Sequence, residues 1–508
     1  MTRILILAAM LWGALTPEQQ HGREIYRRGK MGGAAVGTAA IGAEGVPLPS
    51  SSFACATCHG TWGEGSRESG IEPPPLNWKR LTSPAVSPAT GRRRGAYTPE
   101  TLRRAITAGL DPSGARLHPG MPRYRMPDGR LADLLAYLER LGDDADTDPG
   151  VTSTSIRIGA VLPLSGPLAS AGKSIRETLE LLFDQASRDG GIYGRSLELV
   201  VEDSHGDPAG LLDATRRLLA EDRIFAMVGN LQVGANADTD HLLETAEVPL
   251  IGPVAPSPHE RSVPNPYVFY LLPSLYDQAR AVVDFLASRD AARLPRLAVI
   301  CGGTAFDQDV VDGLRSQAAV HGLKIVSNER EAPSVLATVL ATQPDYLVFT
   351  GDGDGLVRIG RELDQTNPSP VLIGFISTAQ SGMSLLPPNV AARSLFAAPA
   401  LPPDTRLGSP FFSLLQAGGL PTNYLGLRTA AFAAGNVLVR ALRSCGSHLD
   451  RDSLVRTLEH LQHFETGVVP PLTFGPNRRV GSAGAVILAL DPAGHDVVAI
   501  SDWITPKL

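Results

Sequence analysis

The pentapeptide Cys55-Ala56-Thr57-Cys58-His59 restricts the fold of this chain more than any other feature. C-x-x-C-H is the attachment pattern of c-type haem, in which each of two thiols forms a thioether to one porphyrin. The adjacent histidine then lies where it can bind the iron as the proximal ligand. The pentapeptide therefore predicts one covalent haem c, held through Cys55 and Cys58, with His59 as an axial ligand. A chain of this kind matures outside the cytoplasm.

The same two cysteines could instead form half of a zinc site or a thiol redox pair. A structural zinc site needs a second pair of ligands, and the two remaining cysteines, Cys301 and Cys445, are isolated and far along the chain. A redox pair expects a strand before the motif and a helix after it, whereas a loop rich in Gly, Ala, Pro and Ser precedes it and Gly60 follows. Haem attachment is the better interpretation. Cys301 and Cys445 could be free thiols or a disulfide.

Segments on both sides of the pentapeptide extend this interpretation. They are a helical Gly22–Tyr26, a proline turn at Pro73–Leu76, a Met-Pro loop at Gly120–Tyr124 and a leucine-striped helix at Leu131–Leu141. In this order they resemble a class I c-type cytochrome domain, which is an all-α fold. The leucines of the last segment form one apolar face at helical spacing. The spacer before the pentapeptide is longer than in the small cytochromes.

The resemblance implies particular contacts around the haem. A backbone carbonyl of the proline turn accepts the Nδ1–H of His59 and fixes the ring. Tyr26 and Tyr137 meet where the first and last helices cross. Pro75 and Tyr124 belong to the segments that bind the cofactor.

Three side chains could supply the sixth iron ligand. A thioether sulfur stabilises ferrous iron, which suits an electron carrier. Met121 occupies the Met-Pro position that the resemblance assigns to the ligand. Met126 also precedes a proline and could instead fill a gap in the core. His118 lies three residues upstream of Met121 and could be a solvated loop residue.

The length of 508 residues predicts two or three domains. Residues 1–15 carry one positive charge and a short apolar run, which resembles a secretory signal peptide cleaved after Ala14. The run is short for a membrane-spanning helix. We expect a cytochrome domain at 16–142, a linker at 143–155 and a second domain at 156–508. The mature protein is expected in the periplasm, with no stable membrane anchor.

The net charge of −6 is small for this length and argues against a nucleic-acid partner. Positive charge gathers in the predicted cytochrome region, at Arg92–Arg94, Arg103, Arg104, Arg123 and Arg125. These arginines could form a docking surface for an acidic redox partner or a solvated face. The acidic stretch Asp143–Gly150 ends in Pro-Gly and predicts an interdomain linker.

Strands and helices alternate from Ile156 onward, which predicts parallel sheets covered by helices. About 350 residues of this pattern should divide into two lobes. The predicted strands are Ile156–Leu162, Ser196–Glu202, Ile224–Val228, Val248–Ile251, Leu297–Ile300 and Tyr346–Phe349, and the first helices are Ile175–Ala186 and Leu211–Ala220.

An ordered set of short motifs accompanies this pattern: Leu164–Gly172, Asp189–Gly194, Glu202–Ser204, Val228–Asn230, Pro249–Pro253, Thr473–Asn477 and Ser501–Ile504. Together they resemble the type I periplasmic binding proteins of the branched-chain amino acid group, which are ABC-transporter receptors. The resemblance implies a two-lobed α/β fold that binds a small molecule between its lobes, at the carboxyl ends of the strands, and closes by a hinge.

The resemblance assigns cleft residues by position. In the first lobe they are Ser170, Ala171, Gln232, Val233, Ala255 and Ser257, and in the second lobe Phe306, Asp352, Asp354 and Ser377. Ala171 stands where the family offers an aromatic residue, a ligand-binding serine is replaced near Val233, and the pair Ala255-Pro256 replaces Ala-Thr. These departures argue against a conventional α-amino acid ligand. Asp352 and Asp354 could hold a cation or an amine, or could cap a helix in a Gly/Asp loop.

The sequence leaves three functions open. The first is a periplasmic electron carrier whose second domain binds a solute or a partner dehydrogenase or cytochrome. The second is a solute receptor for an ABC permease with the haem as a redox reporter. The third is an oxidoreductase that acts with a partner dehydrogenase. No Ser-His-Asp, H-E-x-x-H or phosphate-loop pattern is present, so the chain is expected to carry electrons and bind a ligand rather than to be an enzyme.

Overall fold

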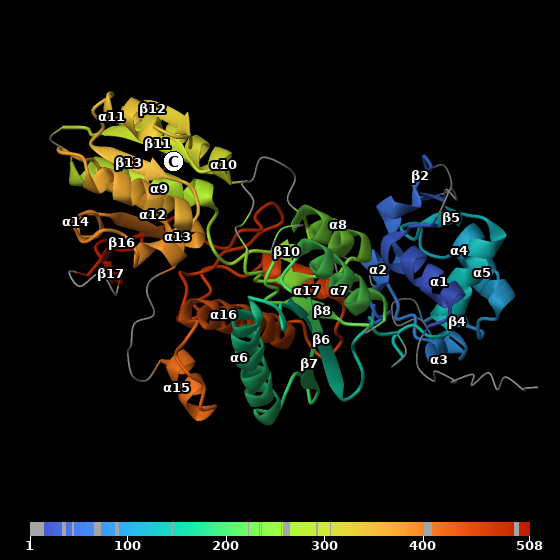
Figure 1. Ribbon diagram of the computed structural model, residues 1–508. Helices are drawn as coiled ribbons and strands as arrows, with labels where there is room; N and C mark the ends of the chain where they lie inside the picture. The colour runs from blue at the N-terminus through green and yellow to red at the C-terminus, as the bar shows by residue number, and fades with distance from the viewer. Residues whose placement is uncertain are drawn as a thin grey trace, which may run out of the picture. The chain divides into compact units, whose positions relative to one another are not determined.

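The structure is a computed structural model (Figure 1). It describes residues 15–32, 37–42, 45–65, 73–86, 91–143, 146–221, 223–232, 234, 236–255, 257, 265–290, 293–304, 306–400, 409–491 and 497–507. The chain divides into two compact units, Met1–Thr147 and Asp148–Leu508, and the boundary falls within the predicted linker. The predicted signal peptide lies outside the described residues except for Leu15, which is buried in the core of the N-terminal unit.

The secondary structure of the described N-terminal unit is mainly helical. The helices are α1 (Pro17–Arg28), the short 3-10 helix η1 (Ser50–Phe53), α2 (Cys55–His59), α3 (Trp78–Leu81), α4 (Pro99–Ala108) and α5 (Asp128–Leu138). A capping box between Thr16 and Gln19 starts α1, and Gly29 in the left-handed conformation ends it. The haem motif therefore lies on a helix of its own, α2.

The first and last helices of this unit pack closely, as the sequence predicted. An added Cβ at Gly22 would lie 2.1 Å from the carbonyl oxygen of Asp133, so only glycine allows this approach. The rings of Tyr26 and Tyr137 meet with centroids 5.6 Å apart. The leucine stripe of α5 is buried throughout. Helical periodicity was sufficient to identify this contact face.

The prediction of an all-α unit is wrong in one respect. Short strands β2 (Leu48–Pro49), β1 (Thr38–Ala40) and β5 (Arg123–Arg125) form an antiparallel sheet, and β3 (Ala85–Val86) pairs with β4 (Arg93–Arg94). The long spacer before the haem motif supplies β1 and β2, and β1 pairs with β5 directly after the Met-Pro loop. Backbone pairing therefore gives the inserted residues partners for their polar groups.

Two acidic residues within the predicted linker are buried. The Asp146 side chain has no exposed surface, and its carboxylate accepts hydrogen bonds from Tyr137 Oη at 2.8 Å and from the Gly142 amide at 3.2 Å. Asp148 is also buried and accepts from the Arg451 amide at 2.6 Å. An acidic side chain can be buried where hydrogen-bond donors from other segments surround it.

The C-terminal unit contains two sheets, as predicted. The first has the order β10-β9-β8-β6-β7 and is parallel. Its strands are β6 (Ser155–Leu162), β7 (Ser196–Asp203), β8 (Ala226–Val228), β9 (Leu250–Ile251) and β10 (Val268–Phe269). Its helices include α6 (Ala169–Arg188), α7 (Pro208–Ala220) and α8 (Asn236–Ala246).

The second sheet has seven strands in the order β12-β11-β13-β14-β15-β16-β17, and the last two pair antiparallel. Its strands are β11 (Arg296–Cys301), β12 (Lys324–Arg330), β13 (Tyr346–Phe349), β14 (Val371–Phe375), β15 (Leu395–Ala398), β16 (Val486–Leu490) and β17 (Val497–Ala499). Its helices are α9 (Leu275–Arg289), α10 (Asp307–His321), α11 (Val335–Leu340), α12 (Gly353–Asp364), α13 (Ile376–Met383) and α14 (Pro388–Ala391).

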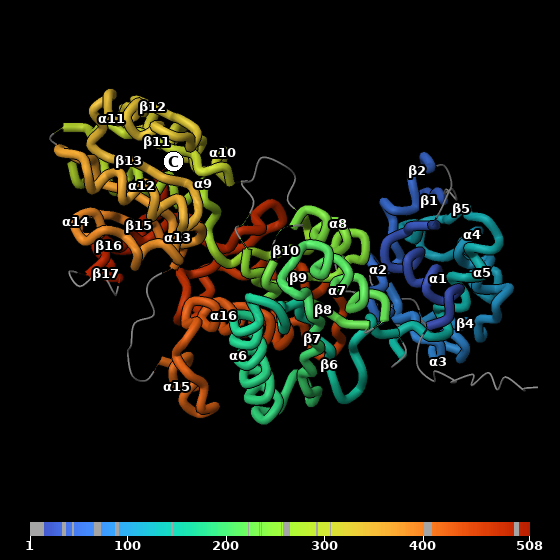
Figure 2. The backbone as a smooth tube through the Cα atoms, viewed as in Figure 1, coloured from blue at the N-terminus to red at the C-terminus, as the bar shows by residue number. Residues whose placement is uncertain are grey.

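The chain passes between the two sheets more than once (Figure 2). After β15 and α15 (Pro410–Ala417) it returns to the first lobe as α16 (Leu425–Ser444) and α17 (Arg451–Glu459). The buried Arg428 of α16 donates to the Ser174 carbonyl of α6 at 3.1 Å and pairs with Glu177 at 2.9 Å. The chain then goes back to form β16 and β17. These returns define the two lobes.

Candidate functional sites

The two cysteines of the haem motif share one face of α2, because residues three apart in a helix are neighbours. Both are free thiols, with Cys58 exposed and Cys55 half-buried. The hydroxyl of Tyr124 donates to the Phe53 carbonyl and lies 3.9 Å from Cys55 Sγ. Burial raises the pKa of Cys55 to about 11. A thiol redox pair lowers the pKa of its nucleophilic cysteine, and burial acts in the opposite direction on Cys55.

The histidine of the motif is oriented by the predicted second contact. His59 Nδ1 lies 2.9 Å from the carbonyl oxygen of Pro74, which accepts its hydrogen when that nitrogen is protonated. The predicted hydrogen bond between His59 and a carbonyl of the proline turn is therefore present, and Pro74 is the acceptor. Burial lowers the pKa of His59, and the bond to Pro74 opposes this. When Nδ1 carries the proton and donates to Pro74, Nε2 keeps the lone pair that a metal requires.

The residues around α2 fit a haem. They offer two thiols and one imidazole on a single short helix, beside apolar side chains that pack on the core yet stay partly exposed: Phe53, Ala56, Leu76, Trp78, Tyr97 and Met126. Tyr26 Oη donates to the Gly60 carbonyl at 2.8 Å and ties the end of α2 to α1. Within the described ranges, no group of three or more His, Cys, Asp or Glu side chains is placed to hold a metal ion, so the second half of a zinc site does not appear there.

The three candidates for the sixth ligand lie in different surroundings. Met126 packs against the apolar core, as its alternative interpretation predicted. His118 Nδ1 accepts a hydrogen bond from the Gly120 amide at 3.1 Å. Met121 is half-buried in the loop after α4, and its amide donates to the His118 carbonyl at 3.1 Å. The packing of Met126 and the local bond of His118 both favour Met121.

Most of the predicted basic surface has structural partners. Arg92 pairs with Asp111 at 2.7 Å and Arg103 with Asp128 at 2.9 Å. Arg94 donates to the carbonyls of Arg80, Leu81, Ser83 and Gly95 and lies over the Tyr97 ring. Arg104 donates to the Asp111 and Pro112 carbonyls. The sequence could not show these bonds, which hold several of the arginines in place. Arg93 and Arg125 are exposed.

The first-lobe candidates come together at one edge of the five-stranded sheet. The Leu231 amide donates to the Val161 carbonyl at 3.1 Å, and the Gln232 amide donates to the Val254 carbonyl at 3.2 Å. These bonds bring the carboxyl ends of β6, β8 and β9 together, with Gln232 beside the segment of Ala255. Ser170 and Ala171 lie in the first turn of α6, which follows β6. Val233 lies outside the described residues.

The side chains at this edge differ in whether their polar atoms have hydrogen-bond partners. Gln232 is 6% exposed, and neither atom of its amide has a hydrogen-bond partner within the described structure. Asn230, which the motif analysis noted but did not select, accepts from the Val161 amide at 3.0 Å. Ser257 is buried and donates to the Leu272 carbonyl, whereas Ser170 is exposed. Gln232 therefore has the most unused hydrogen-bonding capacity among the predicted residues.

In the second lobe the structure supports the capping interpretation of the Gly/Asp loop. Asp352 accepts from the Gly355 amide at 2.9 Å and is the N-cap of α12. Asp354 and Ser377 are exposed in the first turns of α12 and α13. Phe306 is the N-cap residue of α10 and packs partly on the core.

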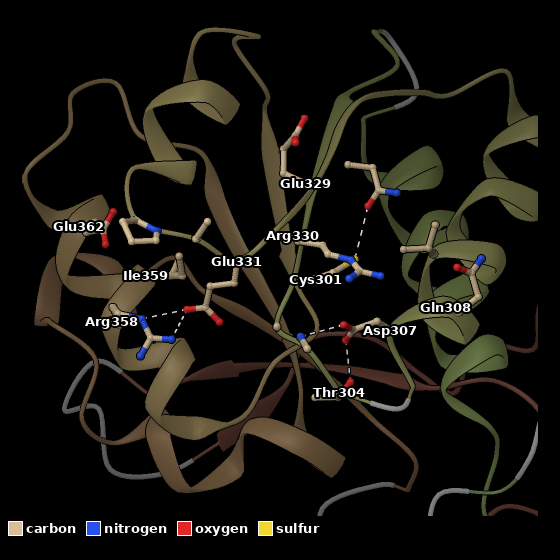
Figure 3. Close-up of a pocket in the computed structure, with 16 residues that line it drawn as sticks. Cys301, Thr304, Asp307, Gln308, Glu329, Arg330, Glu331, Arg358, Ile359 and Glu362 are labelled. Atoms are coloured by element: carbon tan, nitrogen blue, oxygen red, sulfur yellow. Dashed lines mark hydrogen bonds and ion pairs between the residues drawn. The ribbon is translucent and has the colours of Figure 1, made fainter.

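A groove of about 960 Å³ opens at the carboxyl ends of β11 and β12 (Figure 3). It is lined by Cys301, Thr304 and Asp307 on one side and by Glu331 and Arg358 on the other. Glu331 and Arg358 form an ion pair, while Asp307 accepts from Thr304 at 2.6 Å. Cys301 contacts Asn328, and Cys445 contacts Thr457, each as a free thiol. The sequence did not predict this groove, because edge strand β12 carries no recognisable motif.

Two helix-covered sheets with three chain passages define a two-lobed α/β binding protein. Residues 155–494, more than half of the chain, match the family model of the periplasmic binding proteins. The chain belongs to the periplasmic binding protein family. No helix in the described part of the chain is long and apolar enough to cross a membrane.

Relatives and solved structures agree with this assignment. The Leu/Ile/Val-binding protein BraC3 of Rhizobium johnstonii is 22% identical over 62% of this chain and 86% of that protein. A Brucella abortus Leu/Ile/Val-binding protein homolog is 26% identical over 46% of this chain and 61% of that protein. A putative branched-chain amino acid ABC transporter from Silicibacter pomeroyi has a TM-score of 0.60 at 15% identity, covering 70% of this chain and 98% of that one. The solved structures show the shared fold.

Proposed function

We propose that the protein is a periplasmic electron carrier with a haem c in its N-terminal unit and a solute-binding site in its C-terminal unit. The observation that carries the first half is the position of His59. It lies on the same short helix as both cysteines, and the Pro74 carbonyl orients its ring. Haem c would supply one-electron iron chemistry. Cys55 and Cys58 would hold it covalently, His59 and Met121 would ligate the iron, and Pro75 and Tyr124 would contact it. A periplasmic dehydrogenase or another cytochrome would be the redox partner.

The first test of this proposal is chemical. The full chain, produced in a periplasm that attaches c-type haem, should retain haem after denaturation and acid-acetone extraction. A chain that folds but carries no covalent haem would remove the basis of the electron-transfer proposal. It would leave the family assignment of the C-terminal unit unaffected, because that assignment rests on residues 155–494.

The distal ligand gives a separate prediction. Met121→Ala should remove the weak long-wavelength sulfur-to-iron absorption of the ferric protein and lower its potential, because the thioether favours ferrous iron. Met126→Ala is the matched control and should reduce stability while leaving the band in place, because Met126 packs on the core. A spectrum that changes in Met126→Ala and not in Met121→Ala would assign the ligand to Met126.

The second half of the proposal concerns the solute. Relatives are named Leu/Ile/Val-binding proteins, and one solved structure, from Thermus thermophilus, is a branched-chain amino acid ABC transporter protein with bound valine (TM-score 0.57, 17% identity, covering 70% of this chain and 97% of that one). Here Ala171, Val233 and Ala255-Pro256 depart from that amino acid pattern, and Asp352 caps a helix. We therefore propose a small solute without a conventional α-amino acid head group, delivered to an ABC permease or sensed by the chain itself.

A ligand screen by thermal shift tests this half, because a solute that binds only the folded state raises stability with the logarithm of its concentration over Kd. Leucine, isoleucine and valine are expected to give no shift, whereas small carboxylates and amides without an α-amino group should include a binder. Gln232→Ala should weaken that binder about tenfold, since its amide has no hydrogen-bond partner among the described residues. Gln462→Ala is the control, because its amide already donates to the Phe474 carbonyl at 2.8 Å. Tight valine binding would contradict the proposal.

A further inference from the structure

The guanidinium of Arg123 binds several backbone carbonyls of the loop that carries Met121. Arg123 lies on β5, two residues beyond Met121, and donates to the backbone carbonyls of Met121, Leu117 and His118, the last two at 3.4 Å. Its side chain is half-buried. Three carbonyl dipoles directed at one place would repel one another without a donor between them. Arginine is suited to this position, because it presents five N–H donors in a rigid fork.

Arg123 is itself held in place from both sides. β5 pairs with β1, where Arg123 lies opposite Ala40. The next residue, Tyr124, is buried and donates to the Phe53 carbonyl beside the haem motif. The guanidinium thus connects a strand anchored near α2 to the loop that bears the proposed axial ligand.

A glycine provides the space for this guanidinium. Gly109 is the C-cap residue of α4. An added Cβ at this glycine would lie 1.9 Å from Arg123 Nε and 2.1 Å from Arg123 Cζ. The same glycine accepts a hydrogen bond at its carbonyl from the Leu117 amide at 2.8 Å. The arrangement would not survive a side chain at this position without displacement of the guanidinium.

We propose that Arg123 is a positioning residue that holds the Met121 loop for axial ligation. This inference rests on the proposed haem and on Met121 as its ligand. Without the guanidinium, the carbonyls of Leu117, His118 and Met121 would turn toward water, since an unsatisfied acceptor is costly to bury. The loop would then sample more conformations, and Met121 would compete less well with an external ligand for the iron.

The experiment measures imidazole binding to the full-length ferric protein by the change in its Soret absorption. Arg123→Gln should bind imidazole about tenfold more tightly than the wild type, equivalent to about 1.4 kcal/mol, and should show a weaker sulfur-to-iron band. Arg125→Gln is the matched control, because it removes the same charge from the same strand at an exposed position. Arg125→Gln should keep the wild-type affinity. Equal imidazole affinity in the two variants would overturn the role of Arg123.

A second test keeps Arg123 and displaces its guanidinium by a substitution at a neighbouring glycine. Gly109→Ala should displace the guanidinium and tighten imidazole binding in the same direction as Arg123→Gln. Gly114→Ala is its control, because both glycines have a positive φ (67° and 81°) but an added Cβ at Gly114 meets open space. Arg123→Lys should fall between wild type and Arg123→Gln, and it serves if Arg123→Gln does not fold. Wild-type behaviour of both Gly109→Ala and Arg123→Lys would refute the inference.

The two levels of failure are distinguishable. Every variant is first assayed for haem that survives denaturation. A wild type without covalent haem would refute the proposed function and this inference with it. A wild type with haem, whose imidazole affinity is the same as that of Arg123→Gln, Gly109→Ala and Arg123→Lys, would refute the positioning role alone.

Discussion

The double variant Cys55→Ala with Cys58→Ala is expected to lose covalent haem completely. Each thiol can form only one thioether, and both lie on α2, so no other described cysteine can replace them there. The measurement is haem absorbance in the protein fraction after acid-acetone extraction, together with the intact mass.

The matched control is Cys301→Ala with Cys445→Ala. These thiols contact Asn328 and Thr457 in the C-terminal unit, and their loss should leave covalent haem unchanged. Haem that survives extraction in Cys55→Ala with Cys58→Ala would show that the pentapeptide is not the attachment site.

Asp146→Ala should destabilise the N-terminal unit by about 3–5 kcal/mol, the usual cost of breaking a buried ion pair. The carboxylate lies 3.1 Å from Arg23 Nε and 3.4 Å from an Arg27 guanidinium nitrogen, and the side chains of these arginines are 14% and 7% exposed. Burial raises the pKa of Asp146, although both arginines and the Tyr137 hydroxyl oppose this. Removal of the carboxylate would take this acceptor away from two largely buried guanidinium groups.

Hydrogen exchange of peptides from α1 and α5 in the full chain measures this effect, because exchange reports the free energy of opening of each region separately. Asp143→Ala is the control: its ion pair with Arg140 is exposed on both sides and should contribute at most about 1 kcal/mol. Equal protection of α1 in the two variants would show that the buried cluster does not hold the unit together.

Local patterns were enough to predict much of this molecule. The leucine stripe of α5 and the strand-helix alternation after Ile156 depend only on spacing along a few turns or residues, and both are confirmed. The bond between His59 and the proline turn was also predicted, because a motif supplied both partners. The helix α6 begins at Ala169, earlier than the apolar periodicity suggested, because its first turn consists of small residues that carry no large apolar side chain.

The sequence by itself determined the two-unit organisation and the lobed α/β fold. Tertiary structure alone decided which polar groups meet. From the sequence alone, Asp146 is predicted to be a linker residue. In the folded chain it pairs with Arg23 and Arg27, which lie more than a hundred residues earlier. Arg123 is predicted to be part of a charged surface, and in the folded chain it donates hydrogen bonds to three backbone carbonyls. Periodicity records which face of an element is apolar, whereas the partner of a buried charge depends on distant segments that only the folded chain brings within hydrogen-bonding distance.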